Sequence, residues 1–220
     1  MDKVNLNADF AYKIVLTGDI GVGKTQIVKR FVFNMFDDNH QSTIGMDIST
    51  KLIERNGKKI NLSLWDTMGQ EQYKSLANIY YKGFQGAIIV FDLTKRDSFI
   101  NMLKWINNLN LHLTEKVAVL LIGNKADLKD KREVMENEAK IFASEHHFAY
   151  LETSAKTNFN IENAFLSLCD QMLKNQGVKL MEELKTTEKV VPKGENIEES
   201  KDNVKLNQAS NQKKKKSGCC

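Results

Sequence analysis

Short, almost uniformly apolar segments recur along the chain, and most are separated by stretches with helical periodicity. Five such segments occupy residues 12–18, 61–66, 86–92, 117–123 and 148–152. Runs of this length and composition are typical of strands buried on both faces of a parallel sheet. A sixth segment, 46–55, alternates apolar and polar residues and is followed by Asn56-Gly57, a hairpin turn signal. We therefore predict an α/β fold: a mostly parallel six-stranded sheet with one antiparallel edge strand and helices on both faces.

Two segments repeat apolar residues at helical spacing and are predicted to be helices. In residues 97–109 the repeat consists of Phe99, Leu103, Ile106 and Leu109. In residues 160–175 it consists of Ile161, Phe165, Leu168 and Met172. Cys169 lies on the second apolar stripe, so we interpret it as a small buried hydrophobic residue rather than a reactive thiol.

The C-terminal part of the chain has a different composition. From about Gly177 onward the periodicity fades into Lys, Glu, Asn, Ser and Gln, which cannot bury enough apolar surface to fold. We predict one folded domain over 8–176 and a flexible, hypervariable tail over 177–220. The formal charge of +4 is concentrated in the tail, since residues 176–220 hold ten lysines and seven acidic residues. The nearly neutral remainder has no basic stripe with interleaved aromatic residues, so we expect no nucleic-acid partner.

The three cysteines are Cys169, Cys219 and Cys220. Adjacent cysteines at a chain end do not form a disulfide framework, which favours a reducing compartment. The first residues lack an apolar signal segment, and the longest apolar run, 117–122, is far too short to span a bilayer. We therefore expect any membrane attachment to be made through the C-terminal end.

Residues 18–25, GDIGVGKT, match the pattern G-x-x-x-x-G-K-[ST]. They follow a predicted buried strand and precede a helical pattern, as a phosphate-binding loop requires; a simple glycine turn is the less favoured alternative. Glycines let successive backbone N–H groups converge on phosphate oxygens, the helix presents its positive end, and Lys24 adds a charge. The hydroxyl of Thr25 is left to coordinate Mg²⁺. The loop thus predicts binding of a nucleoside di- or triphosphate.

Asp127 predicts which base is bound. The motif NKAD, residues 124–127, directly follows an apolar segment, and ETSAK, residues 152–156, stands at the end of the next one. The carboxylate of Asp127 can accept hydrogen bonds from the N1–H and the exocyclic N2–H of guanine. Adenine offers neither donor and would leave a buried carboxylate unpaired. We therefore expect guanine; an ATP-dependent kinase is disfavoured by Asp127 and by the lack of an acceptor-recognising insertion.

Five motifs together carry a family resemblance: GDIGVGKT, Thr43, WDTMGQE at 65–71, NKAD and ETSAK. In this order and spacing they resemble the motifs of Ras-like small GTPases, and STIGMD, YYKG, ETSAK and the terminal Cys-Cys are similar to the Rab family in particular. The resemblance covers about residues 8–175 and the last two residues. It implies a P-loop NTPase fold of the small G-domain type and a monomeric GTPase that hydrolyses GTP to GDP.

The resemblance implies a role for each matching residue. Nucleotide contacts would be made by Gly18, Gly21, Val22, Gly23, Lys24, Thr25, Phe36, Thr43, Gly69, Asn124, Lys125, Asp127, Ser154, Ala155 and Lys156. Magnesium would be held by Thr25, Thr43 and Asp66. Gln70 would orient the attacking water, and the segments of Thr43 and Gly69 would be ordered only while the γ-phosphate and Mg²⁺ are bound. Packing and turn formation remain the alternative roles for Phe36 and Asn124.

Two residues beside the expected γ-phosphate depart from the family pattern. Ile20 stands where Rabs usually have serine or another small residue, and Met68 stands where they usually have alanine. Larger side chains there would crowd the reacting water, the Gln70 amide and an arginine supplied by a GTPase-activating protein (GAP). Slow hydrolysis with weakened GAP stimulation is one interpretation. The other is that both side chains point outward and have no effect.

Further departures concern loop closure and partners. His40 replaces a frequent tyrosine, which predicts looser closure of its loop over the phosphates. Ile48, Trp65 and Tyr80 fall where Rabs present an aromatic-rich effector patch, but isoleucine replaces the usual phenylalanine. Gln72 replaces an arginine. The patch could still bind an effector, whereas these exchanges leave the identity of that effector open.

The tail ends in KKKKSGCC. Lys213–Lys216 alone could be a solvated charge run. Cys219 and Cys220, however, resemble the doubly geranylgeranylated end of Rabs, and two lipid chains suffice for stable membrane anchoring. The resemblance then implies the cytoplasmic face of an intracellular membrane, with a soluble cytosolic pool. It also implies an exchange factor, a GAP, effectors, an escort protein and a GDP-dissociation inhibitor (GDI) as partners.

Two functions remain open at this point. In the first, the chain is a GTP-hydrolysing switch that regulates vesicle traffic from a prenylated membrane anchor. In the second, Ile20 and Met68 have abolished useful hydrolysis, and the GTP-locked form is a membrane adaptor that acts as a binding module. Gln70 favours the first function, and the two bulky residues favour the second.

Overall fold

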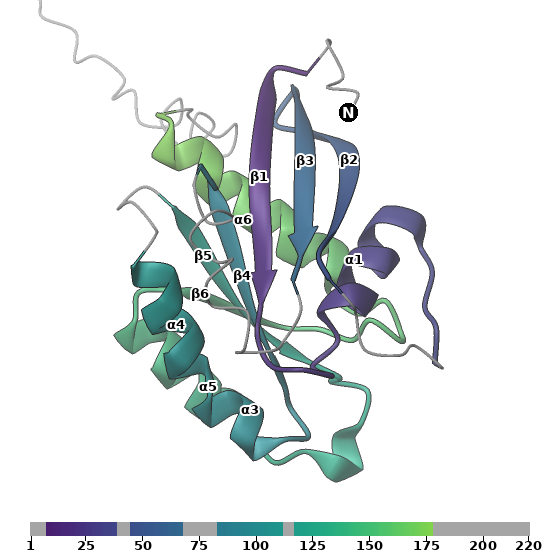
Figure 1. Cartoon of the computed structure of the whole chain (residues 1–220), viewed down its shortest axis with the longest axis vertical. Helices are drawn as coiled ribbons and strands as arrows, with labels where there is room; N and C mark the ends of the chain where they lie inside the picture. The colour runs from purple at the N-terminus through teal and green to yellow at the C-terminus, as the bar shows by residue number, and fades with distance from the viewer. Residues whose placement is uncertain (1–7, 39–44, 68–82, 112–116, 178–220) are drawn as a thin grey trace, which may run out of the picture.

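The computed structural model describes residues 8–38, 45–67, 83–111 and 117–177. Within these ranges, six strands form one sheet in the order β2-β3-β1-β4-β5-β6. The strands are β1 (Phe10–Thr17), β2 (Asp47–Arg55), β3 (Lys58–Asp66), β4 (Gly86–Asp92), β5 (Ala118–Asn124) and β6 (Ala149–Glu152). β2 pairs antiparallel with β3 and the other pairings are parallel, which confirms the predicted sheet with its antiparallel edge strand (Figure 1).

The turn between β2 and β3 has the predicted hairpin geometry. Asn56 and Gly57 have φ angles of 53° and 69°, and positive φ at both central residues is what the two-residue hairpin turn requires. The resulting register places Ile48 directly opposite Trp65. Residues that face each other in an antiparallel pair share one face of the sheet, so these two side chains are neighbours.

Helices cover both faces of the sheet. They are α1 (Lys24–Phe33), α3 (Arg96–Ile100), α4 (Met102–Asn110), α5 (Glu136–Glu145) and α6 (Ile161–Asn175), with a 3₁₀ turn η2 (Lys129–Lys131). One core, around Ile27 and Phe165, joins the sheet to α1 and α6. The other, around Trp105 and Ala139, joins it to α3, α4 and α5, which lie together in Figure 1. Every residue of β4 is buried between these layers, which explains its uniformly apolar sequence.

The predicted helix at 97–109 is divided in two, because Asn101 separates α3 from α4. Leu103, which the apolar repeat placed on the buried stripe, is 45% exposed, and Met102 and Trp105 are buried instead. The indole has the larger apolar surface, and residues three apart share a face of a helix. Trp105 together with Met102 therefore sets the buried face, and the prediction for Leu103 was wrong.

The predicted helix at 160–175 is confirmed as α6. Its four predicted apolar residues are buried, and Cys169 is buried as well, with no exposed surface. Among the helices of the described ranges, none has the length and apolar character needed to cross a membrane.

Candidate functional site

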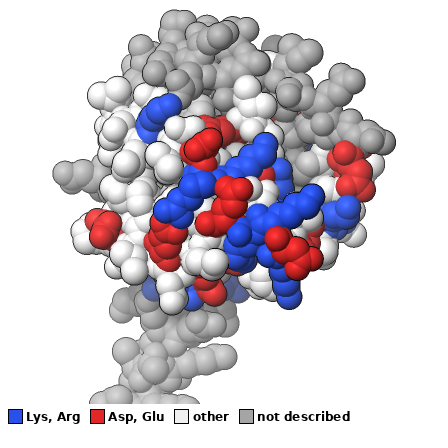
Figure 2. All heavy atoms as spheres, turned by 90° about the horizontal axis from the view of Figure 1, so that it is seen from below, with Lys and Arg blue, Asp and Glu red and all other residues white. Residues whose placement is uncertain are grey.

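The polar motifs meet at the carboxyl ends of the parallel strands. The loop of residues 18–25 leaves β1 and enters α1, while Asp66, Asp92 and Asn124 end β3, β4 and β5, and Glu152 ends β6. Because these five strands are parallel, their carboxyl ends lie together, where open α/β sheets bind ligands (Figure 1). Figure 2 looks onto this end of the molecule, where acidic and basic side chains are interleaved.

The loop approaches its neighbours so closely that two of its glycines admit no side chain. Gly18 has a φ of 138°, and a Cβ there would stand 2.1 Å from the carbonyl oxygen of Val90. Gly23 has a φ of 100°, and its Cβ would stand 2.4 Å from Nδ2 of Asn124. A side chain at Gly18 would push the loop away from β4, and one at Gly23 would displace the Asn124 amide or the loop. The strands thus fix the path of the loop backbone.

Lys24 is buried under this loop, with 5% of its surface exposed. Its Nζ donates hydrogen bonds to the carbonyl oxygens of Gly18, at 2.8 Å, and of Asp19, at 2.9 Å. Burial lowers the pKa of Lys24 to about 8, against the opposing effects of the Asp66 and Asp19 carboxylates. An ammonium group held by neutral carbonyls gains strongly from a nearby anion, so this lysine is suited to a phosphate.

Thr25 and Asp66 bring two oxygen ligands together. The hydroxyl of Thr25 donates to Oδ2 of Asp66 at 2.5 Å, and Asp66 is 2% exposed at the end of β3. A hydroxyl and a carboxylate oxygen are the hard donors that Mg²⁺ prefers, so the pair fits that ion. The third predicted magnesium ligand, Thr43, lies outside the described residues.

Asn124 connects the phosphate loop to the ETSAK segment. Its Nδ2 donates to the carbonyl oxygen of Val22 at 2.9 Å. Its Oδ1 accepts from Oγ1 of Thr153 at 3.1 Å and from the backbone N–H of Ala155 at 3.4 Å. The side chain is 2% exposed, and it spans elements separated by about a hundred residues. Asn124 is therefore a buried connector, which goes beyond the role of a turn residue.

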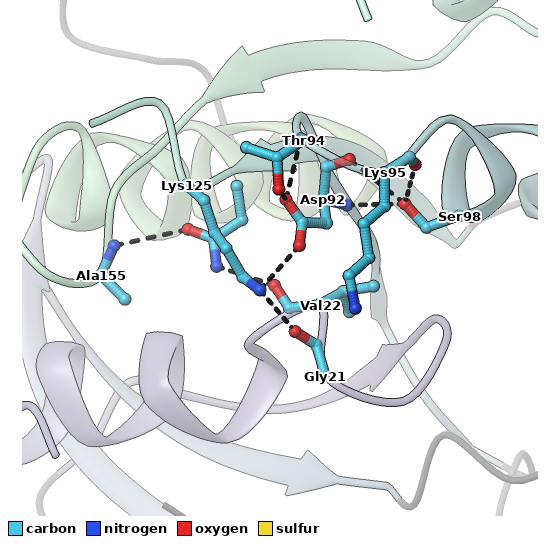
Figure 3. A network of polar contacts seen from close by, with 9 residues as sticks. Gly21, Val22, Asp92, Thr94, Lys95, Ser98, Lys125 and Ala155 are labelled. Carbon is cyan, nitrogen blue, oxygen red and sulfur yellow. Dashed lines mark hydrogen bonds and ion pairs between the residues drawn. The ribbon is translucent and has the colours of Figure 1, made fainter. Parts of the chain in front are cut away.

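Lys125 joins the same loop to the end of β4, as Figure 3 shows. Its Nζ donates to the carbonyl oxygen of Gly21 at 2.8 Å and lies 2.6 Å from Oδ2 of Asp92. Asp92 is fully buried, and its Oδ1 accepts from both N–H and Oγ1 of Thr94. Sequence reasoning missed Asp92. The signal was present, because Asp92 ends a buried strand just as Asp66 and Asn124 do.

Asp127 and Ser154 are brought into direct contact. Oγ of Ser154 donates to Oδ1 of Asp127 at 2.5 Å and accepts from the N–H of Thr157 at 3.1 Å. The hydroxyl thereby fixes the orientation of the carboxylate that the sequence assigns to guanine. Ser154 is fully buried and Asp127 is half-buried, so the contact is partly shielded from water.

Phe36 lies between two cations. The guanidinium of Arg30 and the Nζ of Lys156 each stand 6.0 Å from the centre of its ring. Lys156 also lies 3.1 Å from Oδ1 of Asp38, while Arg30 donates to the carbonyl oxygens of Ala155 and Lys156, at 2.8 and 3.1 Å. Arg30 was not predicted from the sequence. It fastens the ETSAK segment to α1 and to the ring that would cover the base.

Ile20 is 47% exposed and lines a surface cavity of about 390 Å³. The cavity is also lined by Asp19, by Glu133 and by residues 95–98, which include the start of α3. The side chain is therefore on the outer side of the phosphate loop.

Several predicted residues lie outside the described ranges. They are His40, Thr43, Met68, Gly69, Gln70, Gln72, Tyr80, Lys213–Lys216, Cys219 and Cys220.

Part of the predicted effector patch is described. Ile48 and Trp65 are half-buried neighbours across β2 and β3. The indole of Trp65 meets the ring of Phe84 edge-on, with ring centres 5.5 Å apart, and Lys13 stands 5.6 Å above it. These contacts hold the indole against the sheet. Tyr80, the third residue of the patch, is not among the described residues.

Comparison with known proteins agrees with this arrangement of motifs. A model of the Ras family matches residues 13–174. The Ras-related protein Rab-10 of Diplobatis ommata is 44% identical over 171 residues, which cover 78% of this chain and 86% of that protein. The Ras-related protein Rab-1D of Dictyostelium discoideum is 41% identical over 180 residues, covering 82% of this chain and 88% of that protein. RABA1b of Arabidopsis thaliana is 36% identical over 218 residues, covering 99% and 97%. The chain therefore belongs to the Ras family and is a Rab-type small GTPase.

Proposed function

We propose that this GTPase is a membrane-traffic switch in which the residues assembled at the carboxyl ends of the strands bind GTP with Mg²⁺. The observation that carries the proposal is the linkage of three parts of the site. Asn124 and Lys125 hold the phosphate loop by its Val22 and Gly21 carbonyls, while the adjacent Asp127 is oriented by Ser154. A phosphate cradle and an acceptor for guanine are thus held at a fixed separation.

Guanine selectivity is assigned to Asp127. The parent chain should bind GDP far more tightly than ADP in calorimetry, because adenine would leave the carboxylate unpaired. Asp127→Asn replaces one acceptor oxygen with an amide donor. The preference should then move from GDP to xanthosine diphosphate, whose additional carbonyl accepts from that amide. A parent chain without preference for GDP over ADP would contradict the proposal.

Magnesium fits the oxygen pair of Thr25 and Asp66, with Thr43 as the further expected ligand. When bound, the ion neutralises charge on the β- and γ-phosphates. Lys24 holds the phosphates from beneath the loop, and Gln70 orients the water that attacks the γ-phosphate. Thr43 and Gly69 order their segments in the GTP form and release them after hydrolysis.

Hydrolysis is proposed to be slow and weakly stimulated by a GAP. Because Ile20 is exposed on the outer side of the loop, its side chain leaves the cradle open to nucleotide. Its proposed effect is therefore limited to partners that approach the loop from outside, such as the arginine of a GAP. This observation favours a cycling switch with reduced GAP sensitivity over the GTP-locked adaptor, which requires that hydrolysis be blocked.

Single-turnover phosphate release separates the two functions. A switch releases phosphate slowly in the parent, and Ile20→Ser with Met68→Ala raises both the intrinsic rate and the GAP stimulation. Ile100→Ser is the matched control, since Ile100 is also exposed, at 57%, but lies on α3. Unchanged rates in the double variant dismiss the role of these two residues. Absence of phosphate release from the parent, with or without GAP, supports the adaptor.

Membrane anchoring is assigned to prenyl groups on Cys219 and Cys220. Lys213–Lys216 add about 1 kcal/mol each on an anionic cytoplasmic leaflet, so lipids and charge together place the protein on an intracellular membrane. An escort protein and a GDI then account for the soluble pool, and an exchange factor, a GAP and effectors complete the cycle. Mass spectrometry of the cell-derived chain should find two prenyl groups, which Cys219→Ser with Cys220→Ser removes. Two unmodified thiols in the parent contradict this assignment.

A further inference from the structure

The carboxylate of Asp19 accepts two hydrogen bonds from side chains at the start of α4. Nδ2 of Asn101 donates to Oδ2 of Asp19, and Nε1 of Trp105 donates to Oδ1, each at 2.8 Å. Asn101 stands between α3 and α4, and Trp105 lies on the first turns of α4 with 7% of its surface exposed. Both carboxylate oxygens are thus directed at the helices that cover the sheet.

An acidic side chain is an unfavourable component of a loop that binds anions. Asp19 is the second residue of the phosphate loop, and its own carbonyl oxygen lies 2.9 Å from Nζ of Lys24. Its carboxylate raises the pKa of Lys24, as the carboxylate of Asp66 does, because both favour the charged ammonium. A carboxylate at this position can therefore compete with phosphate for the lysine, unless it is held in another direction.

We propose that Asn101 and Trp105 are positioning residues for nucleotide binding, which keep the Asp19 carboxylate away from Lys24 and from the phosphates. The inference rests on the proposed binding of phosphate by this loop. The two donors satisfy the acceptor oxygens of Asp19 at a place where the carboxylate does not repel the ligand. Lys24 then retains its neutral carbonyl partners and remains available to the nucleotide.

Release of this restraint has a predictable consequence. A free carboxylate can rotate towards the Lys24 ammonium, form an ion pair with it and oppose the phosphates. The loss of binding affinity should be larger for a GTP analogue than for GDP, because the triphosphate carries more negative charge. If the two hydrogen bonds have a purely structural role, their loss should lower the affinity for both nucleotides by the same factor. That loss of affinity would then not depend on the charge of Asp19.

The test combines loss of the donors with removal of the acceptor. Asn101→Ala with Trp105→Phe deletes both donors and retains the aromatic ring. Affinity for GDP, measured by calorimetry, should fall about tenfold or more, and affinity for a non-hydrolysable GTP analogue should fall further. Adding Asp19→Ala should restore both affinities to within about twofold of the parent, because the competing charge is gone. Asn107→Ala, an exposed amide on the same helix, is the matched control and should bind as the parent does.

Each outcome decides between the two roles. The proposal is overturned if the double variant binds like the parent, or if Asp19→Ala fails to restore binding to a double variant with a native circular dichroism spectrum. If the double variant does not fold, Trp105→Phe alone is tested with and without Asp19→Ala, and the same rescue is required. A parent chain that binds no GDP refutes the underlying proposal of nucleotide binding and is recognised before any variant is compared.

Discussion

Lys125 forms a short ion pair with Asp92, with its Nζ 2.6 Å from the carboxylate oxygen Oδ2. Lys125 follows β5 and Asp92 ends β4, and the same ammonium also holds the Gly21 carbonyl of the phosphate loop. The pair therefore holds the phosphate loop in a fixed position relative to the ends of β4 and β5. Asp92 is completely buried, so its charge depends on Lys125 and Thr94 for compensation.

Asp92→Asn should destabilise the protein and accelerate nucleotide release. The substitution keeps the shape of the side chain but leaves the Lys125 ammonium without its counter-charge, and Lys125 is only partly exposed. We expect the free energy of unfolding to fall by about 1–3 kcal/mol, measured by denaturant titration of the GDP-loaded protein. Dissociation of a fluorescent GDP derivative should be faster, because the Gly21 carbonyl loses a fixed donor.

An exposed ion pair of equal length provides the control. Lys140 lies 2.6 Å from Glu136 on the surface of α5, and both side chains are more than half exposed. Lys140→Gln should change the free energy of unfolding by less than about 0.5 kcal/mol and leave GDP release unchanged. Equal effects of Asp92→Asn and Lys140→Gln would show that the buried pair does not position the loop.

Arg30 should control the rate of GDP release through the ETSAK segment. Its guanidinium donates to the carbonyl oxygens of Ala155 and Lys156 and to that of Asn34 at the end of α1. Arg30→Lys keeps the positive charge near Phe36 but cannot form this fork of hydrogen bonds. GDP dissociation should therefore accelerate about tenfold in Arg30→Lys and in Arg30→Ala alike.

Lys29→Ala is the matched control for Arg30, because it removes a neighbouring cation of α1. Stopped-flow dissociation of fluorescent GDP is the measurement, and Lys29→Ala should release GDP at the parent rate. If Arg30→Lys releases GDP as slowly as the parent, charge near the ring is sufficient and the fork is not required.

The sheet could be predicted from sequence because the burial of a strand determines its pattern of apolar and polar residues. Uniform apolar runs gave five strands, and the alternation at 46–55 gave the antiparallel edge. α5 was not singled out, since only Ala139 and Ala143 are buried on it and two small residues leave little periodic signal. The break at Asn101 was also missed, because the apolar repeat continues across it.

The site was predictable where function resides in a local motif. The loop 18–25, NKAD and ETSAK are each contiguous in sequence. Arg30 was not predictable, because its contact with Ala155 spans 125 residues and neither residue type signals the other. The contact between Asp19 and Trp105 spans 86 residues and is hidden for the same reason. Such connecting residues depend on tertiary packing, which a single sequence without relatives does not display.

Cys169 should be unreactive in the folded protein. The thiol is fully buried in the core with α6, and burial raises its pKa to about 12, so almost none is thiolate at neutral pH. In a Cys219→Ser, Cys220→Ser variant, Cys169 is the one cysteine left of three. That variant should show no rapid reaction with Ellman's reagent until denaturant is added, and then one thiol per chain. Rapid labelling of the folded variant would contradict the burial.

Lys24 should make nucleotide binding depend on pH above neutrality. Burial lowers its pKa to about 8 from the ordinary value of 10.5 in the free protein, and a bound phosphate raises it again. Between these limits the complex holds more protons than the free protein, so binding takes up a proton and affinity falls as pH rises past about 8. The unfolded chain also holds more protons than the free folded protein from about pH 8 to 10.5. The stability of the ligand-free protein should therefore gain from Lys24 as pH rises through that window.

Calorimetry in two buffers of different ionisation enthalpy measures the proton uptake directly. GDP binding at pH 8.5 should take up a larger fraction of a proton per complex than at pH 7, because most free chains then carry a neutral Lys24. Lys24→Met has no proton to gain, so its uptake reports only on other groups, including N1 of guanine, and serves as the baseline. The prediction fails if parent and Lys24→Met take up the same fraction at pH 8.5. In that case Lys24 would already be charged in the free loop, and the burial beneath Gly18 and Asp19 would not hold its pKa near neutrality.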